Sequence, residues 1–410
     1  MRLAIVACTV VLASVADAST ADVFGFGSEE SAVCGASTAR VHDFSAAFYN
    51  PAGFTAIRSA EATIGFFAGG ATLQATSLPR FHLSDSVALV VGGGAPIPFG
   101  GVLQDRIYFG IALSILPDKL LRLSAHQSST PFFPLYDNRT QRLMVVPAIA
   151  VRLPRGVSIG IAFNLLAGLE GQVASREGAT RAIEARVDEQ VSTQLAVHVG
   201  AKLEVTRALT LGLTYRQAFR VPFHTVSDNT IGGQPINLDV AASGLFTPDE
   251  VVLGAAYNWR AFLWSLDVAW AHWSAWEGPY VGVDSLLPKV DSVIHAPPPK
   301  INFRDTGSVR IGMQWRAFER GRGSLLLRGG YGFESSPVPA QQSTTVLLDG
   351  NKHRLAIGFG VNLRFAAASM SIDAHGQVDA LQPKTFVNTA GSLSASGAAY
   401  GGGITVTVRR

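Results

Sequence analysis

From about residue 60 to the C-terminus, large apolar side chains alternate with small or polar ones at a period of two. Phe262, Trp264 and Leu266 occupy every second position, while Ser265 and Asp267 stand between them. Successive side chains of a β-strand point to opposite faces, so each such segment has one large apolar face and one small face. The pattern recurs along the chain and predicts an all-β protein.

The small face favours a membrane barrel over a soluble β-sandwich. In a sandwich the second face carries Lys, Glu and Thr toward water, whereas here it carries mainly Gly, Ala, Ser and Asn with a few Arg. Only 15% of the residues are charged, against about 25% in an average soluble domain. Beyond the N-terminus no apolar run reaches the roughly 18 residues of a spanning helix. The sequence therefore predicts a transmembrane antiparallel β-barrel.

The barrel is expected to have about 14 strands. The alternating segments are 60–70, 84–94, 105–115, 143–153, 156–167, 191–205, 207–218, 249–259, 261–273, 306–317, 322–334, 352–365, 368–381 and 398–410. The connections between them alternate between short and long along most of the chain. Short periplasmic turns and long extracellular loops are typical of outer-membrane barrels.

The N-terminus has the pattern of a signal peptide over residues 1–18. Arg2 precedes an apolar stretch of secretory length, and Ala16 and Ala18 provide the small residues that a signal peptidase requires. The alternative is a buried strand or a short anchor. The pattern predicts export to the outer membrane of a Gram-negative cell.

Residues 19–58 lack the alternation and are rich in Gly, Ala and Ser, with several phenylalanines among them. A solvated tail does not keep such aromatic residues. We therefore expect this segment to form a plug, or hatch, inside a barrel that extends over residues 59–410. The alternative is a periplasmic tail.

The plug segment resembles the hatch of the FadL family. The resemblance rests on Phe24-Gly25-Phe26-Gly27-Ser28 and on the stretch 42–53, and it continues through 247–250, 267–276, 303–306 and 327–331. It implies an outer-membrane transporter of long-chain fatty acids, or of aromatic hydrocarbons as in some relatives. Two features depart from the family pattern: the chain ends in Arg410 instead of an aromatic residue, and His42 replaces an acidic residue.

What the resemblance implies is a passive, cofactor-free channel. A hydrophobic ligand is captured by the extracellular loops and passes a lumen that the hatch gates, from which it leaves toward the membrane lipid. The predicted gate residues are Asn50, Pro51, Ala52 and Gly53, and the predicted apolar ligand contacts are Phe24, Phe26, Phe132 and Phe133. We expect 131–135 to be an exposed apolar patch, the alternative being a loop packed on its neighbours. Residues 169–190 have the charge spacing of a solvated helix.

A fatty-acid carboxylate inside the barrel requires a cation or several N–H donors. Arginines on the lumen-facing positions can provide this charge. The predicted order is Arg328, then Arg310 and Arg354. The alternative for each is an ion pair with a lumenal acid such as Asp373 or Glu334.

Other functional classes find little support. The net charge is +3, without a basic stripe for nucleic acid, and the nine histidines show no metal-ligand spacing. Asp267 and His272 fall on opposite faces, so an enzyme is not expected. Cys34, which follows the leader, is expected to be a packing residue. The sequence predicts a monomeric transporter, with a structural, adhesive or enzymatic barrel as the alternative.

Overall fold

The computed structural model describes most of the chain from residue 21 onward. The described residues are 21–76, 78, 81–82, 86–115, 130–137, 143–177, 183–231, 234–285, 299–341, 345–388 and 391–410. The predicted signal peptide, residues 1–18, lies outside them. No described helix has the length and apolar character needed to cross a membrane.

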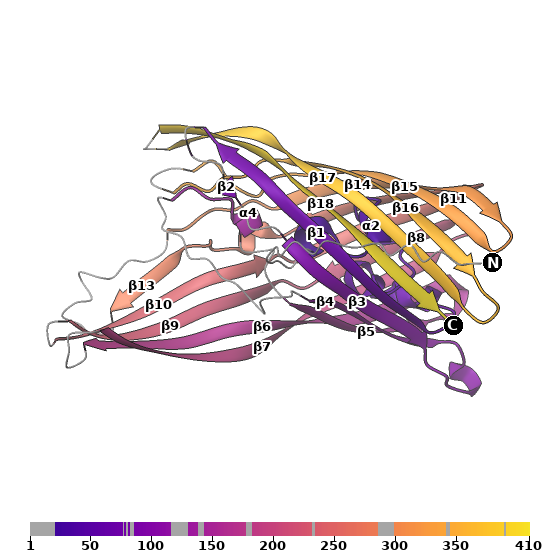
Figure 1. Ribbon diagram of the computed structural model, residues 1–410, viewed down its shortest axis with the longest axis horizontal. Coiled ribbons are helices and arrows are strands. Elements are labelled where there is room, and N and C mark those ends of the chain that lie inside the picture. Colours follow the sequence, from indigo (N-terminus) through magenta and orange to yellow (C-terminus); the bar gives the residue numbers. More distant parts are fainter. Residues whose placement is uncertain are drawn as a thin grey trace, which may run out of the picture.

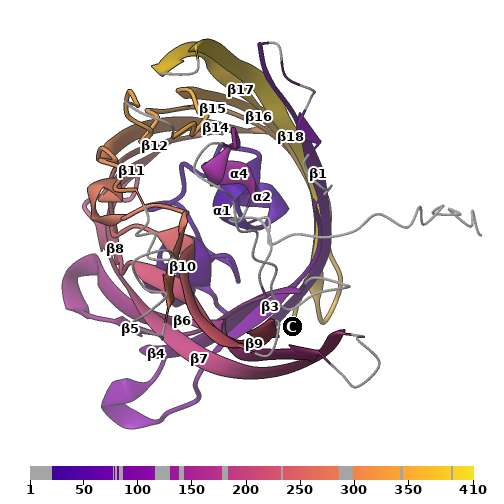
Figure 2. The same ribbon diagram turned by 90° about the vertical axis from the view of Figure 1, so that its left-hand side faces the viewer.

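Within the described residues, fourteen strands close into an antiparallel barrel (Figures 1 and 2). They are β1 (Glu61–Ala75), β3 (Ser86–Pro96), β4 (Ile107–Ile115), β5 (Met144–Arg152), β6 (Val157–Glu177), β7 (Ile183–Glu204), β8 (Leu209–Arg216), β11 (Glu250–Trp259), β12 (Phe262–Ala271), β14 (Thr306–Arg320), β15 (Gly323–Glu334), β16 (Lys352–Arg364), β17 (Ser369–Asn388) and β18 (Gly391–Arg409). The first and last strands pair from Glu61↔Arg409 to Ala75↔Ala395, which closes the cylinder. The predicted fold class is confirmed.

The side-chain alternation follows the wall of the barrel. On β12, Trp264 is 43% exposed on the outside, while the neighbouring Ser265 is 5% exposed and faces the lumen. Leu355 and Ile357 on β16 are likewise on the outer face. An outward apolar face is what the hydrocarbon of a bilayer requires of a barrel. The predicted lipid face is therefore present in the structure.

The long-loop end carries more strand than the sequence predicted. β9 (Phe219–Ile231) and β10 (Gln234–Thr247) form a hairpin between β8 and β11, with β13 (Val281–Ser285) paired to β10, and β2 (Phe81–His82) pairs with β1. The helix predicted within 169–190 is wrong, because β6 and β7 remain paired up to Glu177↔Ile183. A ladder that continues from the wall stabilises extended backbone, whereas charge pairs at helical spacing contribute little to a helix.

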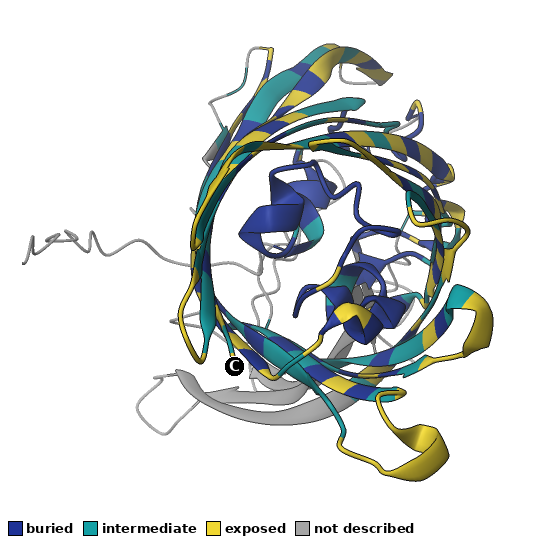
Figure 3. Ribbon diagram, turned by 90° about the vertical axis from the view of Figure 1, so that its right-hand side faces the viewer, coloured by how far each residue is buried: buried dark blue, intermediate teal, exposed yellow. Residues whose placement is uncertain are grey.

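Residues 21–60, here called the lumenal segment, lie inside the ring of strands (Figures 2 and 3). They form α1 (Ala21–Phe24), α2 (Ser28–Ser31), α3 (Ala46–Tyr49) and η1 (Pro51–Ala56), and most of their side chains are buried. Phe26, Phe44 and Phe54 are each 1% exposed or less. They pack with Val90 and Ala112 of the wall in one apolar core.

Glycines of the wall allow the lumenal segment to lie against it. A Cβ atom at Gly160 would be 2.4 Å from the carbonyl carbon of Pro51, and one at Gly212 would be 2.5 Å from the carbonyl oxygen of Thr38. At Gly330 it would be 2.5 Å from the carbonyl carbon of Val33. These neighbours are backbone atoms, which cannot move aside as a side chain can. Several of the chain's glycines are thus needed where backbone meets backbone.

Candidate functional site: the lumen and its mouth

A carboxylate of the barrel wall holds one turn of the lumenal segment. Asp267 Oδ2 accepts hydrogen bonds from the backbone N of Ser37 at 2.9 Å, the backbone N of Thr38 at 3.0 Å and Thr38 Oγ1 at 2.8 Å. Asp267 is buried on β12 and faces the lumen. These three donors replace water at Oδ2 of the buried carboxylate, so Asp267 anchors the segment to the wall.

The four predicted gate residues form the turn into η1. Asn50 Oδ1 accepts from the N of Ala52 at 3.0 Å, and Asn50 Nδ2 donates to the carbonyl oxygens of Thr38 at 2.7 Å and Ala201 at 3.1 Å. Asn50, Pro51, Ala52 and Gly53 are all buried. This turn therefore connects the segment to itself and to β7. Its role as a gate remains a prediction.

Arg328 lies in a buried charge cluster. Its guanidinium pairs with Asp373 at 2.6 Å and with Glu29 at 3.2 Å, and Arg40 pairs with the same Glu29 at 2.7 Å. The Arg328 side chain is 1% exposed. A cation so enclosed has no face left for a ligand, so the structure argues against Arg328 as the first ligand cation and in favour of the alternative, the ion pair with Asp373.

The two glutamates of α2 have opposite electrostatic environments. Burial raises the pKa of Glu29, but Arg328, His42 and Arg40 together lower it to about 2. Burial dominates at Glu30 and raises its pKa to about 7 against the attraction of Arg40. Glu29, Glu30 and His42 have potential ligand atoms within 4.8 Å of one another. Because Arg40 and Arg328 already neutralise these carboxylates, we derive no metal site from this cluster.

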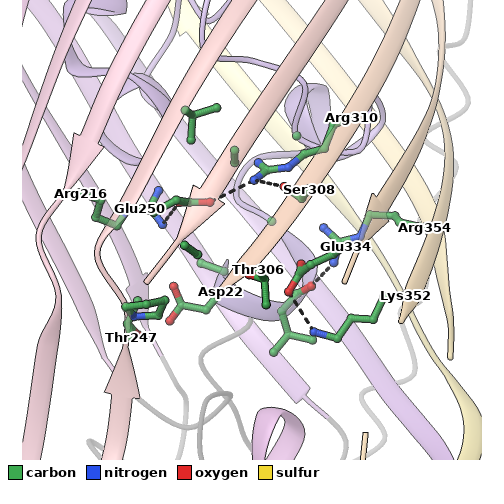
Figure 4. A pocket seen from close by; sticks show the side chains of 18 of the residues that line it. Asp22, Arg216, Thr247, Glu250, Thr306, Ser308, Arg310, Glu334, Lys352 and Arg354 are labelled. Carbon is green, nitrogen blue, oxygen red and sulfur yellow. Dashed lines mark hydrogen bonds and ion pairs between the residues drawn. The ribbon is translucent and has the colours of Figure 1, made fainter. Parts of the chain in front are cut away.

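A cavity of about 120 Å³ lies between the lumenal segment and strands β8 to β17. Charged side chains line it, and its four cations form ion pairs with acidic residues (Figure 4). Glu250 pairs with Arg310 at 3.1 Å and with Arg216 at 3.4 Å. On the other side, Arg354 pairs with Asp379 at 2.6 Å and Lys352 pairs with Glu334 at 3.2 Å.

These pairs determine what Arg310 and Arg354 can do. Both line the cavity, as their lumen-facing positions predicted. Each is also paired to an acid: Arg310 to Glu250 on β11, two strands away, and Arg354 to Asp379 on the neighbouring β17. Arg354 donates in addition to the carbonyl oxygen of Val23 in α1. A carboxylate ligand would therefore compete with Glu250 or Asp379 for these guanidiniums.

Apolar side chains fill the long-loop end of the lumen and form what we call the mouth cluster. Its buried aromatic members are Phe24, Phe67, Phe132, Phe133, Tyr136, Phe246, Trp273, Trp276, Tyr280, Phe303 and Phe386. Neighbouring rings are stacked, tilted or edge-to-face, with centroids 4.5 Å apart for Trp276 and Phe303 and 5.2 Å apart for Phe24 and Phe67. Leu135, Tyr136 and Trp273 also line the cavity, so the cluster and the cavity are in direct contact.

The predicted apolar contacts are divided between two places. Phe24, Phe132 and Phe133 belong to the mouth cluster, whereas Phe26 packs on Phe44 and Phe48 within the lumenal segment. The expectation that 131–135 is exposed is wrong for Phe132 and Phe133, which are 4% and 2% exposed. This loop packs on its neighbours beside α4 (Pro134–Asp137), because the mouth offers an apolar surface to cover.

Sequence reasoning missed three prominent members of the mouth cluster, Phe246, Trp276 and Phe303. Trp276 stands in a loop rich in tryptophan, and this concentration of tryptophan was the available signal. Phe246 stacks on Trp276 at 5.8 Å. Trp276 and Phe303 lie outside the strands, where no period indicates the direction of a side chain, and Phe246 lies in β10, a strand that the alternation did not predict.

A closed barrel with a lipid-facing wall and a folded segment in its lumen belongs to the class of plugged outer-membrane transport proteins. The chain belongs to the family described as "Outer membrane protein transport protein (OMPP1/FadL/TodX)", whose family model matches residues 137–407. The protein is thus an outer-membrane β-barrel of a transport family. No curated protein matches the sequence significantly.

Solved structures agree with this fold over nearly the whole chain. A FadL homologue of Pseudomonas aeruginosa superposes with a TM-score of 0.63 at 13% identity, covering 96% of this chain and 98% of that one. The toluene transporter TodX of P. putida gives 0.61 at 14% identity, with 95% and 99% covered. The toluene transporter TbuX of Ralstonia pickettii gives 0.57 at 14% identity, with 95% and 99% covered.

Proposed function

We propose that the protein is a passive channel that carries hydrophobic small molecules across the outer membrane as a monomer, without a cofactor or a catalytic step. The observation that carries this proposal is the direct contact between the aromatic mouth cluster and the lumenal cavity. Aromatic and aliphatic side chains attract an apolar solute out of water. A solute that enters between the rings reaches the cavity without returning to water.

The lumenal segment is proposed to be the gate that follows the cavity. Gly25, Gly35, Thr38 and Tyr49 of this segment line the cavity on one side. Beyond it stands the turn of Asn50, Pro51, Ala52 and Gly53. A ligand in the cavity can proceed only if this segment moves, which makes its anchors at Asp267 and Arg328 the contacts that set the closed state.

The charged side chains that line the cavity narrow the class of ligand. The sequence resemblance puts long-chain fatty acids first and aromatic hydrocarbons second, and the charges around the cavity reverse this order. The solved structures include toluene transporters as well as a FadL homologue. The four cations that line the cavity, Arg216, Arg310, Lys352 and Arg354, are all paired with acids. Burying a carboxylate beside these pairs costs more than burying a hydrocarbon ring, and this favours the uncharged ligand.

Uptake of labelled toluene and labelled oleate, compared between cells with and without the protein, tests both parts of the proposal. We expect the protein to accelerate toluene uptake severalfold and oleate uptake less. Equal rates for both compounds with and without the protein would rule out hydrophobic transport. Acceleration of oleate alone would reverse the order of the two candidates.

The variant Arg354→Gln with Asp379→Asn provides a finer test. It removes both charges of one pair and leaves no buried ion behind. Toluene uptake is expected to stay within about twofold of the unmodified protein, since the net charge around the cavity does not change. A loss of about tenfold in oleate uptake with toluene uptake unchanged would show instead that Arg354 binds a carboxylate. Heat-dependent migration on gels confirms that the variant barrel is folded.

A further inference from the structure

The short-turn end of the barrel is lined with arginine. The six short connections are residues 97–106, 153–156, 205–208, 260–261, 321–322 and 365–368, and they lie at the right-hand end of Figure 1. Together they contain five arginines and one acidic residue, Asp105. The five are Arg106, Arg155, Arg207, Arg260 and Arg322, and all are exposed. We call this set the arginine rim; no described connection contributes more than one member.

Acidic neighbours do not cancel this charge. Glu204 and Glu319 flank the connections, and Glu319 pairs with Arg316 and Arg364, two further arginines at the ends of the strands. The guanidinium of Arg260 lies 5.2 Å from the ring centroid of Trp259. The rim therefore presents guanidiniums in excess over carboxylates to whatever lies beside it.

The same end carries exposed apolar side chains at the edge of the lipid face. Trp259, Phe318 and Phe365 are about half exposed on the outer wall. The connection 97–106 extends away from the barrel in Figure 3, with the yellow colour of exposed residues, and it presents Val102 at 84% exposure. Aromatic girdles mark the interface between hydrocarbon and headgroups.

The depth of the rim follows from its distance to this girdle. Arg260 is adjacent to Trp259 in sequence, and Arg322 follows Phe318 by four residues. One residue of strand advances about 3.3 Å. The guanidiniums are therefore placed just beyond the hydrocarbon, at the level of lipid phosphates.

We infer that the arginine rim binds the phosphate groups of anionic phospholipids in the periplasmic leaflet of the outer membrane. Short turns of such barrels face the periplasm, where the adjoining leaflet is phospholipid. Guanidinium binds phosphate through paired N–H···O bonds, and clusters of arginine beside a membrane select anionic lipids. This surface is separate from the lumen, and the inference does not depend on the transported ligand.

Native mass spectrometry of the full chain, released from detergent micelles that contain equal amounts of phosphatidylglycerol and phosphatidylcholine, tests the inference. We expect severalfold more retained phosphatidylglycerol than phosphatidylcholine. In the double variant Arg207→Gln with Arg322→Gln, this preference is expected to fall about tenfold. The matched control is Lys300→Gln with Arg304→Gln, which removes two exposed basic residues at the long-loop end and is expected to keep the preference.

Three results would overturn the inference. The two phospholipids could be retained equally by the unmodified protein. The rim variant could keep the preference, or the control could lose it as much as the rim variant does, which would assign the effect to overall charge. Adding millimolar inorganic phosphate, with chloride at the same ionic strength as the control, distinguishes lipid binding from binding of free anion. A bound lipid keeps its acyl chains in the micelle, so millimolar phosphate is not expected to displace its headgroup.

Discussion

Replacing Gly160 with valine is expected to open the closed barrel. The new Cβ atom would lie 2.4 Å from the carbonyl carbon of Pro51 and 2.5 Å from the backbone N of Ala52. Neither atom can rotate away, so the turn that begins η1 must leave the wall of β6. Overpacking of this kind costs about 1–3 kcal/mol or more. The strand ladder itself, which lipid and neighbouring strands hold on both sides, is expected to survive.

Ion conductance in planar bilayers measures the opening. The unmodified protein is expected to show low conductance, because the lumenal segment fills the barrel, and Gly160→Val to show stable steps several times larger. The matched control is Gly376→Val on β17, where nothing lies within 4 Å of the added Cβ atom. If Gly376→Val opens the barrel equally, the effect belongs to loss of strand glycine and not to displacement of the segment.

The barrel could be predicted because lipid imposes one rule on every strand. A side chain such as Trp264 must face hydrocarbon and its neighbour Ser265 must not, so direction is encoded at a period of two. The loops obey no such rule. The charged stretch 169–190 fits helical spacing as well as strand spacing, and only the continuing pairing of β6 with β7 decides between them.

The lumenal residues were predicted in part. The alternation of side chains correctly placed Arg310, Arg328 and Arg354 inside the barrel. It does not show which acidic residues face them. Arg328 pairs with Asp373, which lies 45 residues further along the chain on β17, and with Glu29 of the lumenal segment. Such partners depend on the closure of the barrel and on the position of the segment in it. The role of a buried charge therefore could not be derived from the sequence.

Glycine and charge hold the lumenal segment in complementary ways. Glycines such as Gly160 and Gly330 let its backbone touch the wall at places where a side chain would hold it off. The carboxylate of Asp267 and the guanidinium of Arg328 then fix it at two points of the wall. Close approach alone leaves the segment free to slide along the wall, whereas the hydrogen bonds of Asp267 and the ion pair of Arg328 specify one position. Movement of the segment must break these bonds first.

Substituting Arg328 with methionine is expected to destabilise the seated lumenal segment by about 3–5 kcal/mol, since it leaves Glu29 and Asp373 buried without their cation. The triple variant Arg328→Met with Glu29→Gln and Asp373→Asn removes all three charges and is expected to recover most of this loss. Protease protection of the segment in the detergent-solubilised protein, followed against denaturant concentration, measures both.

Acid provides an independent test of the same cluster. The pKa of Glu29 is lowered from 4.5 to about 2 in the folded protein. A lowered pKa means that the contribution of Glu29 is fully present above pH 4.5 and is lost as the pH falls toward 2. The segment of the unmodified protein should therefore lose protection over this range. The segment of the triple variant, where position 29 no longer titrates, should lose less.

A different result would contradict the structural role of Arg328. If Arg328→Met is as well protected as the unmodified protein but takes up oleate poorly and toluene normally, Arg328 binds the ligand and does not hold the segment.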